Sequence, residues 1–433
     1  MSSGSVGING GGAASAAAGR VPVKVVAATV AGNALEFYDF ITYAFFAVYI
    51  GRAFFPTSDP LSSLLSSLAV FGVGFFFRPL GGFLIGAYAD RAGRKPAMLL
   101  TIALITIGTL GLALTPTYAS IGIAAPVILI LCRLIQGLAL GGEVGPASAF
   151  LIEIAPEGKR GLYSSWQLAS QGMAALAAGI IGVTLSRTLS PEDLTSWGWR
   201  VPFLLALALI PVAVYLRREM PETLHDAGAA PTSARASLGG HWGLIGLSIL
   251  VVMGGTVSTY VGNDMTTFAI TTLKLSPSVA LTAAIVGGVA IIVCSLAGGW
   301  LCDKYNRRTV MIAPRIALAL VAFPLFLLLK STPTPGMLYL VTAVMAGLTA
   351  VSGAASLAAI PELLPRPIRA LGLSIAYAVG VSIFGGTTQY IVAALIGATG
   401  DPTAPAWYVT ATSVICIWAM WALPESKDRR LEN

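Results

Sequence analysis

Charged residues are scarce in this sequence: they make up 10% of its 433 residues, whereas soluble domains carry about 25%. Hydrophobic residues make up 56%, and the mean hydropathy is +0.82. So few charges cannot cover a globular domain with a water-facing surface, which excludes an ordinary soluble protein. We therefore expect an all-α membrane protein.

Histidine and cysteine are also rare, with two and four residues. The cysteines lie in or beside apolar runs without metal-ligand spacing, so we interpret them as small helix-packing residues: Cys132, Cys294, Cys302 and Cys416. The sequence has no P-loop and no nucleophile–base arrangement. We expect neither an enzyme nor an ATP-driven pump, and no metal or cofactor.

Apolar runs long enough to span a bilayer, about 20 residues each, dominate the chain. They cover residues 23–51, 61–89, 97–116, 120–152, 162–186, 199–217, 243–270, 277–301, 309–330, 336–360, 370–397 and 406–423. A polar loop with Pro221 and Pro231 divides these twelve runs six and six. We expect a disordered tail over 1–20 without a cleavable signal peptide. An N-terminal bundle follows over 21–218, then a cytoplasmic linker over 219–241, a C-terminal bundle over 242–424 and a cytoplasmic tail over 425–433.

Lysine and arginine concentrate on one side of the predicted bilayer. If both termini are cytoplasmic, most cations fall in cytoplasmic segments, and few lie outside: Arg52, Arg187, Arg200, Lys274 and Lys330. By the positive-inside rule, we therefore expect a multi-pass protein of the inner membrane with both termini in the cytoplasm. The net charge of +7 reflects these loops and not a nucleic-acid partner.

A charged motif occurs twice, in matched positions of the two halves. Residues 86–95 read GAYADRAGRK, and residues 299–308 read GWLCDKYNRR. A glycine one turn before the aspartate lets a neighbouring helix approach, and the charges after it can pair with the adjoining bundle. The alternative is topogenic charge alone. We predict a gate formed by Gly86, Asp90, Arg91, Gly93, Arg94, Asp303 and Arg307.

A second repeat supports two similar halves. Residues 153–161 and 361–370 each place an acid at a helix end before proline and arginine. Two similar six-helix halves indicate a transporter that rocks about a central site.

With these motifs the chain resembles the major facilitator superfamily, over essentially residues 24–424. The GxxxDRxGRK loop is present in full, and residues 133–137 carry its Arg-x-x-x-Gly element. Residues 32–40, 77–82, 133–143 and 197–202 are more similar to its metabolite:proton symporters. Residues 382–388 and 399–402 look similar to citrate and tricarballylate symporters. Asp264 and Gln389 depart from that pattern and leave the substrate open.

A charge at bilayer depth costs about 2.5–3.5 kcal/mol, so such residues normally face a polar interior. In a helix over residues 23–51, one stripe carries Asn33, Glu36, Asp39 and Tyr43. We predict that Glu36 and Asp39 couple protons. The alternative is that one acid only pairs with Arg78 or Arg133.

Arginines at depth are candidate ligands for an anion, because guanidinium stays charged and binds carboxylate bidentately. We predict this role for Arg78, beside Pro79, and for Arg133 with Gln136; Arg133 and Glu143 are alternatively proton-coupling residues. Arg315 either binds carboxylate or extends back to the cytoplasmic face.

Other polar side chains are candidates to line the cavity or to join helices: Gln167, Gln171, Tyr260, Asn263 and Gln389. We expect Asp264 to be a hydrated residue at the outer rim and Arg200 to be an interfacial anchor.

These residues predict a monomeric, twelve-helix carrier that moves an organic anion, a di- or tricarboxylate such as citrate, together with protons. The run at 162–186 lacks the Gly-Pro element of the antiporter branch, which favours symport. The alternatives are a symporter of betaine or proline, or of another metabolite such as alpha-ketoglutarate, and a membrane sensor.

Overall fold

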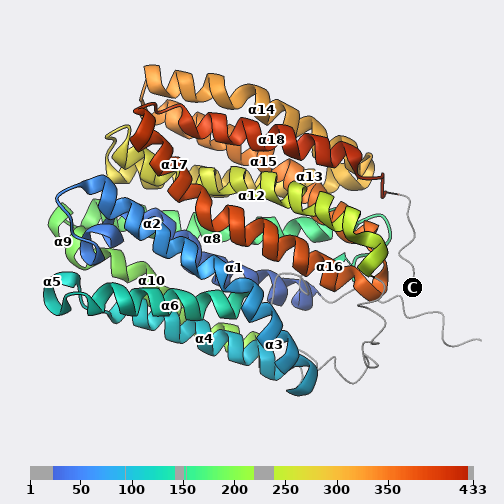
Figure 1. Cartoon of the computed structure of the whole chain (residues 1–433), viewed down its shortest axis with the longest axis horizontal. Coiled ribbons are helices and arrows are strands. Elements are labelled where there is room, and N and C mark those ends of the chain that lie inside the picture. The colour runs from blue at the N-terminus through green and yellow to red at the C-terminus, as the bar shows by residue number, and fades with distance from the viewer. Residues whose placement is uncertain (1–22, 93, 142–150, 153, 219–237, 428–433) are drawn as a thin grey trace, which may run out of the picture.

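The computed structural model describes residues 23–92, 94–141, 151–152, 154–218 and 238–427, and all of its regular elements are helices (Figure 1). In chain order they are α1 Val23–Phe54, α2 Pro60–Phe76, α3 Arg78–Ala92, α4 Arg94–Leu114, α5 Tyr118–Ile121, α6 Ala124–Gly141, α8 Arg160–Thr188, α9 Pro191–Ser196, η1 Gly198–Arg200, α10 Val201–Arg218, η2 Leu238–His241, α12 Trp242–Thr271, α13 Pro277–Lys304, α14 Arg307–Ser331, α15 Pro335–Leu363, α16 Arg366–Val379, the π-helix η3 Gly380–Gly385, α17 Gly386–Thr399 and α18 Ala404–Ala422.

The helices follow the predicted spans and confirm the all-α architecture. Helices α2 and α3 form one span that is broken at Phe77, and α16, η3 and α17 form another. In the described part, nine segments are long and apolar enough to cross a bilayer, and 99–114 and 198–208 are shorter apolar segments. The last predicted span corresponds to α18, which carries the exposed Trp407, Trp418 and Trp421.

The helices form two groups, α1 to α10 and α12 to α18, that lie along each other (Figure 1). We call the end that carries Arg160 and Asp303 the basic end, and the end that carries Asp59 and Asp401 the opposite end. At the opposite end Asp59 caps α2 by accepting from the backbone of Leu61 and Ser62. The Ser62 hydroxyl also donates to Asp59, and these bonds lower the pKa of its carboxyl.

Glycine brings the helices of the first half into backbone contact. A Cβ atom built at Gly137 of α6 would lie 1.9 Å from the carbonyl oxygen of Gly74 on α2. The cysteines serve the same packing, because Cys132 lies against Gly111 and Cys416 against Gly254. Their interpretation as small packing residues agrees with these contacts.

The two halves meet along several helix pairs. Helix α8 runs against α13, where Gly172 and Gly288 face each other at backbone distance. Helix α2 meets α17, where Cβ at Gly72 would lie 2.4 Å from the Gly386 carbonyl oxygen. Helix α1 meets α12. Backbone contact of this kind needs residues without side chains on both partners.

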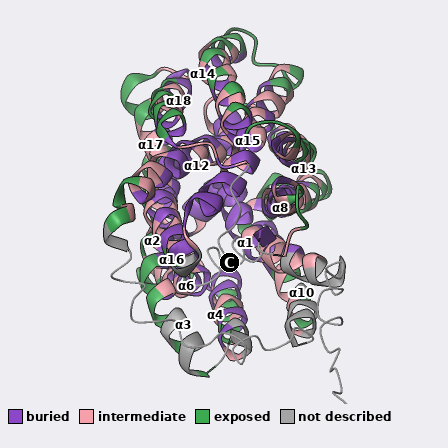
Figure 2. Ribbon diagram, turned by 90° about the vertical axis from the view of Figure 1, so that its right-hand side faces the viewer, coloured by how far each residue is buried: buried purple, intermediate pink, exposed green. Residues whose placement is uncertain are grey.

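The exterior of the helix bundle is apolar. Seen from the basic end, buried residues gather toward the middle of the molecule and exposed ones lie outside (Figure 2). The exposed side chains include Phe83 at 66%, Ile123 at 71% and Leu320 at 70%. An apolar surface of this extent fits a bilayer and not water.

Replacing Gly137 with alanine should destabilise the protein by about 1–3 kcal/mol, because the new methyl group has no space between α6 and α2. Thermal unfolding of the detergent-purified protein measures this. Gly246→Ala is the matched control, since Gly246 also lies within a helix but has no heavy atom within 4 Å of a built Cβ. Equal melting temperatures for the two variants would contradict the packing.

Candidate functional site

A cavity of about 180 Å³ lies between the two halves. Helices of both halves line it, including α1, α3 and α8 from the first and α12, α14 and α15 from the second. Its lining continues toward the basic end at Leu357 and Ile360 of α15 and Tyr377 of α16. The cavity therefore reaches from the middle of the bundle toward the basic end.

Aromatic side chains close the cavity on the other side. Tyr260 packs edge-on against Phe75, with ring centroids 5.4 Å apart, and lies 6.1 Å from Phe71. Beyond them, the Thr267 hydroxyl of α12 donates to the Ala44 carbonyl of α1 at 3.4 Å. We call these contacts between the halves, together with Gly72 against Gly386, the distal seam.

Arg78 enters the cavity at the break between α2 and α3. Pro79 follows it, and Phe77 interrupts the helix, so the chain bends where the guanidinium projects. Arg78 is buried, with its Cζ atom 3.9 Å from the Phe75 ring centre and 4.7 Å from that of Phe40. Its Nε atom has no hydrogen-bond partner among the described residues.

Arg315 enters the same cavity from α14 in the other half. Its Nη1 atom donates to the Gly254 carbonyl oxygen at 3.1 Å and to the Ser258 hydroxyl at 2.8 Å. The side chain is fully buried, so the alternative that it extends to the cytoplasmic face is wrong. Its Nε and Nη2 atoms find no partner in the described part of the chain. Two of its nitrogens therefore remain available for a ligand.

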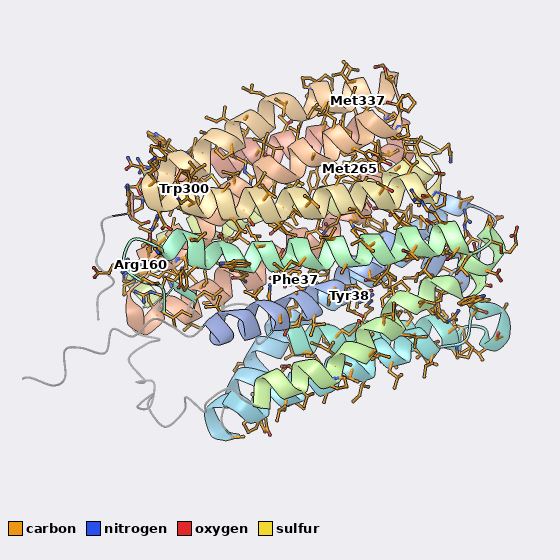
Figure 3. All side chains as sticks on the ribbon, turned by 180° about the vertical axis from the view of Figure 1, so that it is seen from behind. Phe37, Tyr38, Arg160, Met265, Trp300 and Met337 are labelled. Atoms are coloured by element: carbon orange, nitrogen blue, oxygen red, sulfur yellow. The ribbon has the colours of Figure 1, made fainter. Side chains whose placement is uncertain are left out.

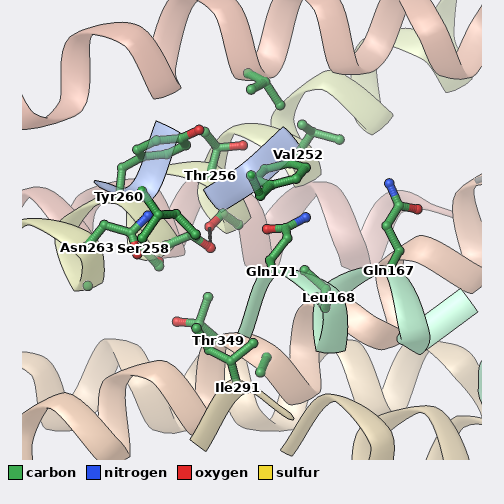
Figure 4. Close-up of a pocket in the computed structure, with 18 of the residues that line it drawn as sticks. Gln167, Leu168, Gln171, Val252, Thr256, Ser258, Tyr260, Asn263, Ile291 and Thr349 are labelled. Carbon is green, nitrogen blue, oxygen red and sulfur yellow. Dashed lines mark hydrogen bonds between the residues drawn. The ribbon is translucent and has the colours of Figure 1, made fainter. Parts of the chain in front are cut away.

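Polar side chains line the cavity from α8 and α12. Gln167 and Gln171 project from α8, and Tyr260 and Asn263 from α12 (Figure 4). Sequence analysis missed Ser258, which carries no signal apart from its place two residues before Tyr260. The predicted ligands Gln171, Tyr260 and Asn263 thus share one cavity with the two arginines.

A closed ring of buried hydrogen bonds joins α1, α4 and α6. Its members are Asp39, Arg133, Gln136 and Thr109. Arg133 Nη1 donates to Asp39 Oδ2 at 3.1 Å and to Gln136 Oε1 at 2.7 Å. Gln136 Nε2 donates to the Thr109 hydroxyl at 3.0 Å, and that hydroxyl donates to Asp39 Oδ1 at 3.0 Å. Sequence analysis missed Thr109, one of many threonines in apolar runs.

This ring lies outside the lining of the central cavity. Asp39 and Glu36 instead face a second, smaller cavity of about 40 Å³ between α1, α4 and α10. The structure therefore separates Arg133 and Gln136 from Arg78 and Arg315, which sequence analysis had grouped as substrate ligands. Only Arg78 and Arg315 of these four lie at the central cavity.

Other predicted site residues have structural contacts or lie apart. Asn33 donates to the Gln167 carbonyl oxygen at 3.2 Å and to the Ser170 hydroxyl at 2.5 Å, which joins α1 to α8. Gln389 is buried in α17 and does not line the cavity. Asp264 is 3% exposed, so its interpretation as a hydrated rim residue is wrong. The reason is that α1 and α17 pack over this part of α12.

Arg200 is held by backbone carbonyls at the opposite end. It donates to the Ser196 oxygen at 2.8 Å and to the Thr115 oxygen at 2.9 Å. Its guanidinium also lies 4.3 Å from the Trp199 ring centre. These contacts fasten α10 to α4 and agree with the predicted anchor.

The second copy of the charged motif joins the halves at the basic end. Asp303 of α13 accepts from the backbone N–H groups of Gly161 at 2.7 Å and Leu162 at 2.9 Å, which caps α8. Arg307 binds Glu362 with two nitrogens, at 3.2 and 3.0 Å, and lies 3.3 Å from Asp303. Arg160, labelled in Figure 3 at this end, lies 3.8 Å from Glu362.

Most side chains of the first copy of the motif lie outside the described part of the structure. The side chains of Gly86, Asp90, Arg91 and Arg94, as well as residues Gly93 and Glu143, lie outside the described part of the structure. Their predicted roles stay predictions.

Comparison with known proteins gives matches over most of the chain. Residues 24–240 match the family model described as "Sugar (and other) transporter", and residues 247–433 match "Major Facilitator Superfamily". A citrate-proton symporter of Klebsiella pneumoniae is 33% identical over 92% of this chain and 91% of its own.

Two further relatives carry other substrate names. An alpha-ketoglutarate permease of Escherichia coli is 35% identical over 92% of each chain. A proline/betaine transporter of Salmonella typhimurium is 32% identical over 95% of this chain and 85% of its own.

A solved structure shares the fold. The xylose transporter XylE of E. coli, in a partially occluded inward-open conformation, has a TM-score of 0.76 and 18% identity, with 94% of this chain and 99% of that one covered. The chain therefore belongs to the major facilitator superfamily of multi-pass membrane transporters, as predicted, among its metabolite:proton symporters and near the citrate-proton symporters.

Proposed function

We propose that the protein takes up an organic anion, a di- or tricarboxylate such as citrate, together with protons by alternating access. The observation that carries this proposal is the pair Arg78 and Arg315, which face one cavity from opposite halves. Each has guanidinium nitrogens without a partner among the described residues. A ligand with two carboxylates would satisfy both arginines and so connect the halves.

The charge of the cavity favours a carboxylate over a zwitterion. Its described lining holds two arginines and neither aspartate nor glutamate. The ammonium of proline needs an acid as well as a cation for its carboxylate, and the quaternary ammonium of betaine needs an acid or an aromatic cage. Amides and hydroxyls at Gln171, Tyr260 and Asn263 can donate to the remaining oxygens of a polycarboxylate. The relatives named for citrate and for alpha-ketoglutarate are consistent with this choice.

The Asp39–Arg133 pair is the proposed proton site. Protonation of Asp39 would remove the charge that Arg133 binds at 3.1 Å. Arg133 lies 5.5 Å from the Phe40 ring centre, and Arg78 lies 4.7 Å from the same ring. Phe40 therefore contacts both guanidinium groups, and a shift of Arg133 would move the wall against which Arg78 packs. Glu36 and Glu143 remain predicted contributors.

The basic-end network is the proposed gate. Asp303 caps α8 across the interface between the halves, so this contact must break when α8 and α13 separate there. By the repeat, Asp90 would cap α16 in the same way. By the positive-inside rule, the basic loops at this end support a cytoplasmic location for it at the inner membrane, with both termini on that side. We also propose that the carrier acts as a monomer.

Arg78→Gln and Arg315→Gln should each reduce citrate uptake by about 10- to 100-fold, because each removes a charged partner worth about 1.5–3 kcal/mol. Uptake of labelled citrate into proteoliposomes with an acidic exterior measures this. Arg200→Gln is the control, since Arg200 lies outside the cavity and binds backbone carbonyls. Wild-type uptake by Arg78→Gln, or competition by betaine stronger than by other tricarboxylates, would contradict the proposal.

Asp39→Asn should lose proton-driven accumulation of citrate but keep exchange of internal for external citrate. The amide can still accept a hydrogen bond from Arg133 but cannot take up and release a proton. Measuring uptake with and without an imposed pH gradient, next to exchange without a gradient, separates the two steps. Accumulation that still follows the gradient would show that Asp39 does not couple protons.

A further inference from the structure

Asp264 of α12 is a buried acid that the proposed function does not use. Its side chain is 3% exposed, and its Oδ1 atom has no hydrogen-bond partner among the described residues. It is also absent from the lining of the central cavity, although Asn263 lines it. An ionised carboxylate buried without a partner is costly, whereas a protonated one is not.

The position of Asp264 on α12 places it inside the distal seam. Tyr260, Asp264 and Thr267 follow each other at helical spacing and form one stripe. Tyr260 packs on Phe75 of the other half, and Thr267 bonds to Ala44 of the other half at 3.4 Å. Asp264 lies between these two levels, so opening the seam would expose it to water.

Gln389 of α17 is a second buried polar group at the same level. It is 1% exposed, and neither its amide nitrogen nor its amide oxygen has a partner in the described part of the chain. Helices α12 and α17 run in contact, and Cβ at Gly385 would lie 3.0 Å from Tyr260 Cε2. One helical turn further along both helices come Asp264 and Gln389.

No described cation is positioned to neutralise Asp264. Burial alone acts on its carboxyl, without a charged neighbour. The charged residues of the described helices packed on α12 lie elsewhere. Asp303 and Lys304 of α13, Glu362 of α15 and Arg369 of α16 lie at the basic end, Arg52 of α1 lies at the opposite end, and Glu36 and Asp39 of α1 face the smaller cavity. Arg315 of α14 contacts α12 at Gly254 and Ser258, which precede Asp264 on that helix. Helices α17 and α18 carry none. Among titratable groups on these helices, Tyr43 bonds to Ser67, and Tyr260 is directed toward Arg78.

We propose that Asp264 is a proton-binding site in the second half that holds the distal seam closed while the proton is bound. The protonated carboxyl is neutral and needs no cation. Loss of the proton leaves a carboxylate that only water can solvate, which favours the open seam. Acid therefore closes the opposite end, and this requires no particular substrate.

The distance between the two halves at the opposite end tests the proposal. Spin labels at Ser58→Cys and Thr332→Cys lie on exposed loops of the first and second halves. Cys294→Ala removes the half-buried native thiol, since the other three cysteines are buried. Distances are measured on the full chain in lipid nanodiscs, without substrate, between about pH 5 and pH 8, where a buried carboxyl can titrate.

The ratio of open to closed protein should rise with pH, by at most about tenfold per pH unit for one proton. Asp264→Asn should stay closed at every pH, and Asp264→Glu should keep the pH dependence. Asp264→Ser, neutral and smaller, repeats the test if the asparagine variant does not fold. Glu192→Gln is the control, since this acid of α9 is exposed at the opposite end, and it should still respond to pH.

Two outcomes would overturn the site. One is a pH response in Asp264→Asn equal to that of the parent, and the other is no pH response in the parent. Neither outcome bears on citrate uptake, so the transport proposal is tested separately.

Discussion

A charge inside a bilayer must be paired, hydrogen-bonded or solvated, and this constraint accounts for most of the polar structure described. Each buried ionisable group meets it differently. Asp39 and Arg133 neutralise each other within a ring closed by Gln136 and Thr109. Arg78 and Arg315 face a cavity and keep free nitrogens, which is the arrangement of a site that waits for an anion. Pairing and solvation thus divide these residues into the proposed proton site and the proposed ligand site.

The helix packing follows a second rule, that backbones approach only where side chains are absent. Glycine pairs between α2 and α6 hold one half together, and glycines between α8 and α13 or α2 and α17 join the halves. Contacts without interlocking side chains let two surfaces slide or part at small cost, unlike a jigsaw core. The interface between the halves is therefore tight in this structure and yet suited to repeated separation. The charges of Asp303, Arg307 and Glu362 then add an ionic network at the basic end.

Much of this was readable from the sequence, because membranes make the rules strict. The spans, the repeat of the charged motif and the depth of Arg78 and Arg315 follow from length, spacing and hydropathy alone. The sequence could not tell which face of a helix each charge occupies relative to helices far away in the chain. Arg133 was therefore grouped with the cavity arginines, although its partners are Asp39 of α1 and Gln136 of its own helix. Asp264 was assigned to a wet rim, since nothing local to residues 243–270 shows that α1 and α17 cover it.

Phe40 contacts two of the buried charged side chains. One aromatic ring carries Arg78 at 4.7 Å and Arg133 at 5.5 Å, and all three side chains are buried. In the proposed coupling, a shift of one guanidinium group would reach the other through packed carbon and not through solvent. Dissolved ions weaken interactions between surface charges over about 8–10 Å at physiological ionic strength, but they do not enter such a core. A carrier built in this way keeps its coupling whether its surroundings are fresh or saline.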